Sequence, residues 1–387
     1  MGSCLLKIVY VSTYPPTHCG VGEYTRMLTA GIKSIDPRIQ VYVVANVEAG
    51  ESRYDPFSGA HVYPLFRRRS QRYSEVIDFL TDIGGTDILH VQHEYGIYGF
   101  SNAILEASIK AREEGLVGKI VFTMHTVYHP LAGVEEAIRF QEGLNQCDAV
   151  IIHSHLQEFE LRNQGVSSSK INRIPHGTLL NPYLGYPRYQ LVNDLGLEKD
   201  RLNGFVIAFP GFLRRDKGFD ILVDSLEYLG RENDDITVLV AGEVWHHEVL
   251  DHLGCLDKLT NLVFWERYLT SDEILKLEAI ADVIILPYND PLAKYSVSGI
   301  LHLSMGSLKP IIGTRVPRLI ELYQYAPRLT VPPRNPRQLA SLIRWVSRNY
   351  DLAVAYMSYL YSYAVRTQWP RIARKHLALY QRLLRKT

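Results

Sequence analysis

Cysteine is scarce in this chain, and neither sign of charge is in excess. Four cysteines, Cys4, Cys19, Cys147 and Cys255, stand far apart among 387 residues, and none forms a Cys-x-x-Cys pair. This spacing argues against a disulfide framework and favours reduced thiols. Lysine and arginine number 42 against 41 aspartates and glutamates, so the chain lacks the overall positive charge of nucleic-acid-binding proteins. We expect no nucleic-acid partner.

Long apolar runs are also missing. No window approaches the roughly 20 apolar residues that a membrane-spanning helix needs. The first apolar stretch ends by Val11 and contains Lys7, which is too short for a signal peptide. An N-terminal lipid signal is disfavoured because the sixth residue is Leu6, not serine or threonine. We therefore expect a cytoplasmic protein.

Several motifs of catalysis and metal binding are absent. His90 and His93 are three apart on a predicted strand, so their side chains would point to opposite faces. His153 and His155 have no cysteine or carboxylate beside them in a metal-ligand pattern. No Asp-x-Asp and no Gly-x-Ser-x-Gly occurs, and the order Lys217-Gly218 is the reverse of a Walker loop. The sequence predicts no metal site and no P-loop.

What the chain does contain is a regular alternation of short apolar runs and helical patterns. Such alternation is typical of parallel sheets built from βαβ units, with strands covered on both faces. The length suits two domains of about 150–200 residues each. The predicted strands are 7–12, 41–46, 88–93, 119–125 and 149–154, then 205–209, 237–241, 262–265, 283–288, 310–314 and 329–331.

One stretch interrupts this alternation. Prolines and glycines cluster from Pro175 onward, and no periodic run appears before Asn203. We interpret the chain as an N-terminal Rossmann-like domain (1–180), a linker (181–203), a C-terminal Rossmann-like domain (204–365) and a last helix (366–387) that packs back on the N-terminal domain. Ligands of such sheets bind at the carboxyl ends of the strands. Two such domains facing each other would make a cleft.

The loop after the first strand carries Gly20 and Gly22 just before a predicted helix. Glycines there allow backbone N–H groups to approach an anion at the helix N-terminus. The dinucleotide-binding pattern needs a third small residue and an acid at the end of the second strand. Thr25 and Asn46 stand at those places, so NAD binding is disfavoured.

Three further loops follow predicted strands. Arg214, Arg215 and Lys217 lie between a strand and a helix, where they would suit a diphosphate or form a solvated basic turn. Ser298 can cap the next helix, with or without a ligand. His125 ends an apolar run and either emerges at the ligand-binding edge or bonds to the backbone.

Together these loops resemble glycosyltransferase family 4, a retaining family with the GT-B fold. The resemblance runs over the whole chain in the family's order. It is carried by Pro15-Pro16 with Gly20-Val21-Gly22, His125, Ile174-Pro175-His176-Gly177, Gly211 to Gly218, Ala281-Asp282-Val283 with Leu286-Pro287-Tyr288, Ser298-Gly299, Lys309-Pro310-Ile311-Ile312 and Glu321.

The resemblance implies a role for each loop. His125 and Lys217 would be catalytic, and His93, Glu94 and Tyr95 would bind the acceptor. The nucleotide-sugar donor would be held without a metal or other cofactor. The donor-binding residues would be Gly20, Gly22, Gly211, Arg214, Arg215, Lys217, Ser298, Gly299, Ile300 and Glu321.

Two departures from the family concern the donor. The family's two donor-site glutamates, the second of which binds the ribose, align with Tyr295 and Leu303. Phe212 stands where an arginine often contacts the diphosphate, and Arg214 or Arg215 could replace it.

We therefore expect a retaining hexosyltransferase that uses a nucleotide-diphosphate sugar, with GDP-mannose and UDP-glucose as leading donors, and a saccharide or lipid-linked acceptor. A non-catalytic GT-B scaffold and a sugar-nucleotide epimerase or phosphorylase remain alternatives. Basic and aromatic residues at Tyr63–Arg69 and Arg371–Lys386 raise the hypothesis of peripheral contact with the inner face of a membrane, against a solvated loop and a packed helix.

Overall fold

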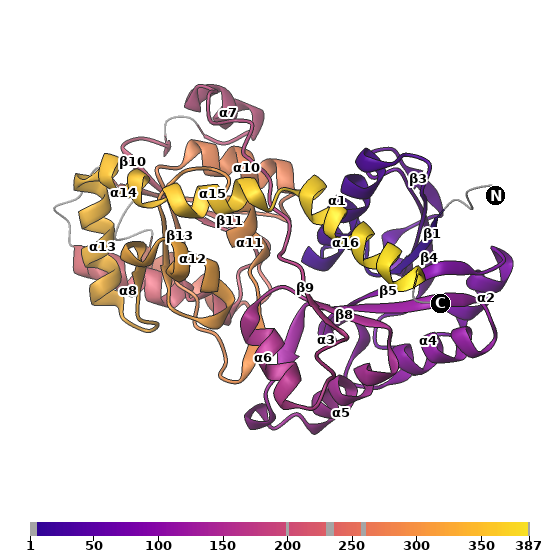
Figure 1. Ribbon diagram of the computed structural model, residues 1–387. Coiled ribbons are helices and arrows are strands. Elements are labelled where there is room, and N and C mark those ends of the chain that lie inside the picture. Colours follow the sequence, from indigo (N-terminus) through magenta and orange to yellow (C-terminus); the bar gives the residue numbers. More distant parts are fainter. Residues whose placement is uncertain (1–5, 199–200, 230–235, 257–260, 386–387) are drawn as a thin grey trace. The chain divides into compact units, whose positions relative to one another are not determined.

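The computed structural model describes residues 6–198, 201–229, 236–256 and 261–385. The chain divides into two compact units (Figure 1). The first unit comprises Met1–Gly177, Leu292–Val297 and Thr367–Thr387, and the second comprises Thr178–Pro291 and Ser298–Arg366. Each unit has its own sheet with helices packed on it, so the predicted α/β class with two Rossmann-like domains is confirmed.

The sheet of the first unit has the strand order β3-β4-β2-β1-β5-β6-β8-β9 and is parallel except for β3. All five predicted strands of this half are present. β3, β4 and β9 lie outside the predicted runs because β3 and β9 have three residues each and β4 contains Pro64. The strands are β1 (Lys7–Val11), β2 (Gln40–Asn46), β3 (Arg53–Asp55), β4 (Ala60–Phe66), β5 (Thr86–His93), β6 (Val117–Met124), β8 (Ala149–Ile152) and β9 (Ile171–Arg173).

Alternate residues of these strands face different helices, as the two-residue period of a strand requires. Val9 and Val91 belong to a core shared with α2, α4 and α5, whereas Tyr10 and His90 face the C-terminal helix α16. The helices of the unit are α1 (Gly20–Ile35), α2 (Ser74–Asp82), α3 (Tyr95–Tyr98), α4 (Ala103–Glu113), α5 (Glu135–Gly143), α6 (His155–Asn163) and α16 (Trp369–Leu384).

Helix α16 packs along α1 and completes the first unit (Figure 1). The helices approach closely at Gly31, where a Cβ atom would lie 3.0 Å from the carbonyl oxygen of Trp369. The hydroxyl of Tyr380 lies 3.0 Å from that of Tyr10 and 2.6 Å from Nδ1 of His90, inside the core. Because its apolar face is buried here, α16 cannot lay that face on a membrane as the basic C-terminal pattern suggested.

A second late segment also belongs to the first unit. Strand β14 (Lys294–Ser296) pairs antiparallel with β7 (Thr126–Tyr128). The side-chain amide of Gln157 donates to the carbonyl oxygens of Met124 and Tyr295, at 3.1 and 3.4 Å. The first unit is therefore assembled from three separate pieces of the chain.

The sheet of the second unit is parallel, with the order β12-β11-β10-β13-β15-β16. All six strands that the sequence predicts for this half are present. The order reverses between β10 and β13, which makes the carboxyl ends of these two strands the topological switch point. The strands are β10 (Phe205–Pro210), β11 (Ile236–Gly242), β12 (Asn261–Glu266), β13 (Val283–Leu286), β15 (Ile311–Thr314) and β16 (Thr330–Val331).

Helices cover both faces of this sheet. The segment 181–203, interpreted from sequence as a linker, carries α7, which packs on α10 and belongs to the second unit. The helices are α7 (Arg188–Asp194), α8 (Phe219–Leu229), α9 (Glu248–Leu256), α10 (Ser271–Ile280), α11 (Gly299–Ser304), α12 (Ile320–Tyr325), α13 (Pro336–Arg348), α14 (Tyr350–Tyr356) and α15 (Ser358–Arg366).

A buried carboxyl between α10 and α11 makes the stability of the second unit depend on pH. Glu278 is fully buried and accepts hydrogen bonds from Ser304 and Ser307, at 2.5 and 2.7 Å. Burial raises its pKa to about 7, against the opposing effect of the two hydroxyls. The stabilisation that this raised pKa provides is complete below the usual glutamate pKa and is lost as the pH rises through 7.

We expect Glu278→Gln to be as stable as the wild type near pH 4.5 and more stable above pH 7, by up to about 3 kcal/mol. Urea unfolding at both pH values measures the difference. Glu227→Gln on the exposed face of α8 removes the same charge and should change neither value. A Glu278→Gln protein that is less stable above pH 7 would show that the carboxylate itself is needed there.

Candidate functional site

The loops after β10 and β13 meet at the switch point of the second sheet. The N–H of Asn289 donates to the carbonyl oxygen of Asp216 at 3.0 Å and joins the two loops. Gly218 has a φ of +70°, and a Cβ atom there would overlap the carbonyl oxygen of Pro287. A glycine at this position allows the loops to approach so closely.

Lys217 is buried at this junction. It ends the 3-10 helix η5 (Arg215–Lys217), is 8% exposed, and holds its ammonium 3.9 Å from the ring centroid of Tyr288. Within the described part of the chain its ammonium forms no ion pair. Burial, followed by the positive charges of Arg318 and Arg214, lowers the pKa of Lys217. The site would thus favour a further negative charge.

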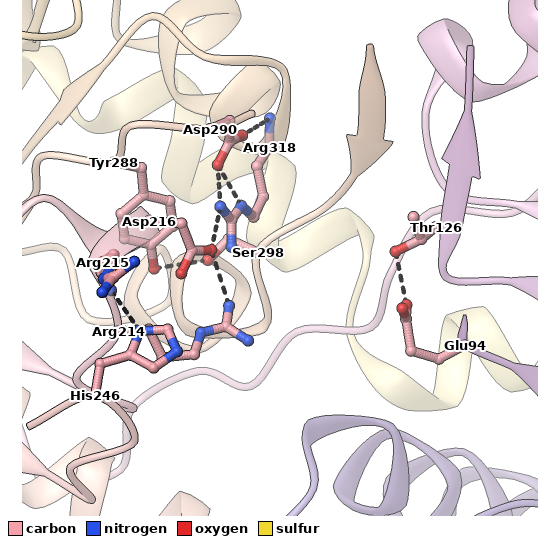
Figure 2. A network of polar contacts seen from close by, with 10 residues as sticks. All are labelled: Glu94, Thr126, Arg214, Arg215, Asp216, His246, Tyr288, Asp290, Ser298 and Arg318. Atoms are coloured by element: carbon pink, nitrogen blue, oxygen red, sulfur yellow. Dashed lines mark hydrogen bonds and ion pairs between the residues drawn. The ribbon is translucent and has the colours of Figure 1, made fainter. Parts of the chain in front are cut away.

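Around Lys217 two arginines and two aspartates form a network of ion pairs (Figure 2). Arg318 binds Asp216 at 2.7 Å and donates from Nε to Asp290 at 2.8 Å. Arg214 donates to Asp216 at 3.0 Å. Although burial opposes it, Arg318 and Arg214 lower the pKa of Asp216 to about 2. Two aspartates stand against two arginines in this network, so the positive charge of Lys217 gives the group a net charge of about +1.

Ser298 caps α11 beside this network. Its hydroxyl accepts from the N–H of Leu301 at 3.2 Å and lies 3.1 Å from the hydroxyl of Tyr288 (Figure 2). Gly299 and Ile300 form the first turn of α11, and Ile300 packs over Gly211, whose φ is +99°. The structure therefore brings together Gly211, Arg214, Lys217 and Ser298 from the predicted donor-binding set.

Two residues of that set within the second unit do not join the network around Lys217. Arg215 is exposed and forms an ion pair with Glu248, while its N–H donates to Nδ1 of His246 at 3.1 Å. Glu321 is buried in α12, with its carboxylate 3.7 Å from Nε2 of His302. Burial raises the pKa of Glu321 to about 7. Of the two arginines proposed to replace the missing one, only Arg214 belongs to the network.

In the first unit, His125 follows β6 and is 9% exposed. Its Nε2 lies 3.0 Å from Oε1 of Gln92, and its ring meets the edge of Tyr24 at 4.8 Å between centroids. Burial, together with His153 and His93, lowers the pKa of His125 well below its usual value. His125 is therefore a neutral imidazole at pH 7, able to donate or accept one hydrogen bond at each nitrogen.

The three predicted acceptor-binding residues occupy different surroundings. His93 is 0% exposed and stacks on Phe140 at 4.1 Å between centroids. A ring so enclosed cannot touch a sugar, so the structure argues against that role. Tyr95 is also buried and donates to Gln141 at 3.0 Å. Glu94 is partly exposed and accepts from Thr126 at 2.6 Å (Figure 2), so it is the one of the three that can reach a ligand.

Gly20 and Gly22 begin α1, as predicted. A Cβ atom on Gly22 would lie 3.3 Å from the backbone of Thr13 and Tyr14, so this glycine lets α1 approach the loop after β1. Gly20 has open space around its α-carbon. His90 and His93 point to opposite faces of β5, toward Tyr380 and Phe140 respectively, as their spacing predicted.

The sequence analysis missed two members of the charged network. Asp290 lies four residues after β13, and Arg318 lies in η6 (Pro317–Leu319), four residues after β15. Both follow strands of the second sheet, so the rule that ligands bind at carboxyl ends could have indicated them. Neither belongs to a motif, and only the fold shows that they meet Asp216.

The described residues contain neither a metal-binding cluster nor a membrane-spanning helix. No group of three or more histidine, cysteine, aspartate or glutamate side chains in that part of the chain is arranged to hold a metal ion. None of the helices described there is long and apolar enough to cross a bilayer.

Two sequence-family models match this chain. A family model described as Glycosyltransferase Family 4 matches residues 19–180, and one described as Glycosyl transferases group 1 matches residues 204–349. A comparison with curated protein sequences found no match.

Three solved structures illustrate the shared fold. A glycosyltransferase from Rickettsia africae is 18% identical with a TM-score of 0.74, covering 99% of this chain and 100% of its own. HepE of Anabaena in complex with UDP-glucose is 15% identical with a TM-score of 0.73, covering 97% and 99%. WaaG, involved in lipopolysaccharide biosynthesis, is 12% identical with a TM-score of 0.66, covering 96% and 99%.

Two Rossmann-like domains, matched by these structures over nearly their whole length, define the GT-B fold. The chain belongs to the group 1 glycosyltransferases, with a family 4 N-terminal domain.

Proposed function

We propose that this protein transfers a hexose from a nucleoside-diphosphate sugar to a saccharide or lipid-linked acceptor, with retention of the anomeric configuration. UDP-glucose and GDP-mannose are the leading donors. HepE, which shares the fold, has been solved in complex with UDP-glucose, and this favours the uridine donor.

The observation that carries the proposal is the buried, unpaired ammonium of Lys217. A cation enclosed in protein without a carboxylate is costly unless a ligand brings the missing negative charge. The diphosphate of a nucleotide sugar would bring it. Arg214 and Arg318 stand on either side of Asp216 and would add donors for the phosphate oxygens.

The same arrangement suits the chemistry of transfer. The bond between the sugar carbon and the diphosphate breaks through an oxocarbenium-like state, and negative charge grows on the leaving oxygens. Fixed positive charge directed at these oxygens lowers the barrier because it needs no rearrangement during the reaction. We propose that Lys217 has this role and that the neutral His125 contacts the transferred sugar. A phosphate oxygen would take the proton of the acceptor hydroxyl.

We further propose that transfer needs no metal ion, since Lys217 and the arginines would neutralise the diphosphate. Contact with a membrane, if it occurs, would use the exposed arginines Arg67 and Arg69 rather than α16. Salt-sensitive binding to vesicles of anionic lipid tests this contact, and its absence would remove it.

We expect one class of nucleoside diphosphate to raise the melting temperature of the protein at millimolar concentration. A ligand that binds only the folded state stabilises it by mass action. Thermal unfolding with UDP, GDP, ADP and the matching nucleotide sugars measures the shift. Repeating it with EDTA should leave the shift unchanged, and NMR of the product should show the anomeric configuration of the donor.

Donor and acceptor together distinguish transfer from the other functions. Release of nucleoside diphosphate that requires an acceptor supports a transferase. A product formed from donor alone would indicate an epimerase. If no nucleotide shifts the melting temperature, the chain would be a scaffold of the same fold.

A further inference from the structure

Three aromatic side chains gather at the carboxyl edge of the second sheet. Each follows a different neighbouring strand: Phe212 follows β10, Trp245 follows β11 and Tyr268 follows β12. The ring centroids of Phe212 and Trp245 are 4.5 Å apart, and those of Phe212 and Tyr268 are 5.8 Å apart. We call these three residues the aromatic platform. Trp245 is 46% exposed, so part of its ring is free to contact a ligand.

Backbone hydrogen bonds fix two of the loops that carry the platform. Leu213 donates to Glu243 at 2.9 Å, and Trp245 donates back to Leu213 at 3.1 Å. Gly242 makes this approach possible, because a Cβ atom there would overlap the carbonyl oxygen of Gly211. Arg267 donates to Gly242 at 3.3 Å and ties in the loop after β12. The platform is therefore held in place without a ligand.

The platform is continuous with the charged network. The guanidinium of Arg214 lies 5.5 Å from the ring centroid of Trp245, and the same group binds Asp216 beside Lys217. A group of aromatic rings thus leads through one arginine to the buried ammonium of Lys217. A nucleoside diphosphate has matching parts in the same order: a flat base, a ribose and two phosphates.

We propose that Phe212, Trp245 and Tyr268 bind the base of the donor nucleotide by stacking. This contact would make up for the ribose-binding glutamate of the family, in whose place this chain has Leu303. The inference rests on the proposed function, since it names the part of the site that recognises the nucleoside. Stacking on an aromatic ring accepts any base because every base has a π-face. The platform accordingly contributes affinity, and the difference between bases comes from other contacts.

The proposal also explains why a phenylalanine stands at position 212. It occupies the position where the family often has a diphosphate-binding arginine, and a phenyl ring cannot replace that charge. Here it packs against Trp245, while Arg214, two residues later, carries the positive charge.

Isothermal titration with UDP, GDP and inorganic pyrophosphate tests the proposal. Trp245→Ala should weaken binding of the nucleoside diphosphate about tenfold or more, the usual loss for one stacked base, and leave pyrophosphate unchanged. Trp245→Phe should restore most of the affinity. Lys217→Met should weaken nucleotide and pyrophosphate alike. Tyr359→Ala, which removes a 75% exposed ring on α15, is the matched control and should change nothing.

The outcomes distinguish failure of the aromatic platform from failure of the proposed function. If the wild type binds UDP or GDP and Trp245→Ala binds it equally well, the platform is rejected and the proposed function stands. A loss in Trp245→Ala that affects pyrophosphate equally would mean that the substitution disturbs the charged network, which also rejects stacking. If the wild type binds none of the nucleotides, both the platform and the proposed function fail.

Discussion

Replacing Lys217 by methionine is expected to lower the turnover number ~100- to 1,000-fold, as the loss of one fixed charge from a leaving-group site does in other enzymes. Methionine keeps most of the volume of the lysine stem against Tyr288, so the loop after β10 should keep its shape. Initial rates of nucleoside diphosphate release, with donor and acceptor both saturating, measure the effect.

The stability of the same variant should move in the opposite direction. Lys217 is buried and lies near two arginines, and together these effects outweigh the attraction of Asp216 and Asp290, so removing its charge relieves desolvation and repulsion. We expect Lys217→Met to unfold at the wild-type temperature or above it. Lys276→Met is the control, because Lys276 lies on α10 and pairs with Asp272, away from the network. Turnover within about twofold of the wild type in Lys217→Met would exclude the proposed role.

Substitution of Gly218 by alanine should destabilise the second unit by about 3 kcal/mol or more. Two separate costs combine at this position. A side chain is strained at a φ of +70°, and its Cβ atom would overlap the carbonyl oxygen of Pro287. The contacting atom is backbone, so relief requires the loops after β10 and β13 to separate. Urea unfolding measures the loss, and donor affinity should fall with it because Lys217 is the preceding residue.

Substitution of a second glycine is a control for which the opposite change in stability is expected. Gly254 lies in helix α9 with open space where a Cβ atom would be. Alanine there should stabilise the protein, by up to about 1 kcal/mol, because glycine is the poorer helix former. An equal loss in Gly254→Ala and Gly218→Ala would show that the steric argument for Gly218 is wrong.

The strands were the most predictable part of this molecule. Parallel strands covered on both faces must be apolar throughout, so runs such as 205–209 and 237–241 stand out in the sequence. Short strands escape this signal: β14 has three residues and is formed by pairing with β7, far away in the chain. The position of segment 292–297 in the first unit follows from that pairing and has no local sequence pattern.

The residues of the candidate site were likewise predictable only in part. Lys217 and Ser298 stand in loops whose motifs can be recognised, and the structure brings them to one edge of the second sheet. Arg318 and Asp290 were missed because they act through each other, and a pair so far apart in sequence has no motif. His93 was assigned to the acceptor from the resemblance, yet its place in β5 buries it against Phe140. Sequence position near a strand end does not decide which face a side chain takes.

The placement of α16 has a consequence for synthesis of the protein. During translation β1 is made well before α16, yet the hydroxyl of Tyr380 supplies hydrogen bonds inside the core between Tyr10 and His90. Until α16 has left the ribosome, the first unit exposes one face of α1 and leaves these polar groups without their partner. The second unit does not include α16 and has no such dependence on it. The domain that is made first should therefore be the last to complete its fold, and the nascent chain should need protection during that interval.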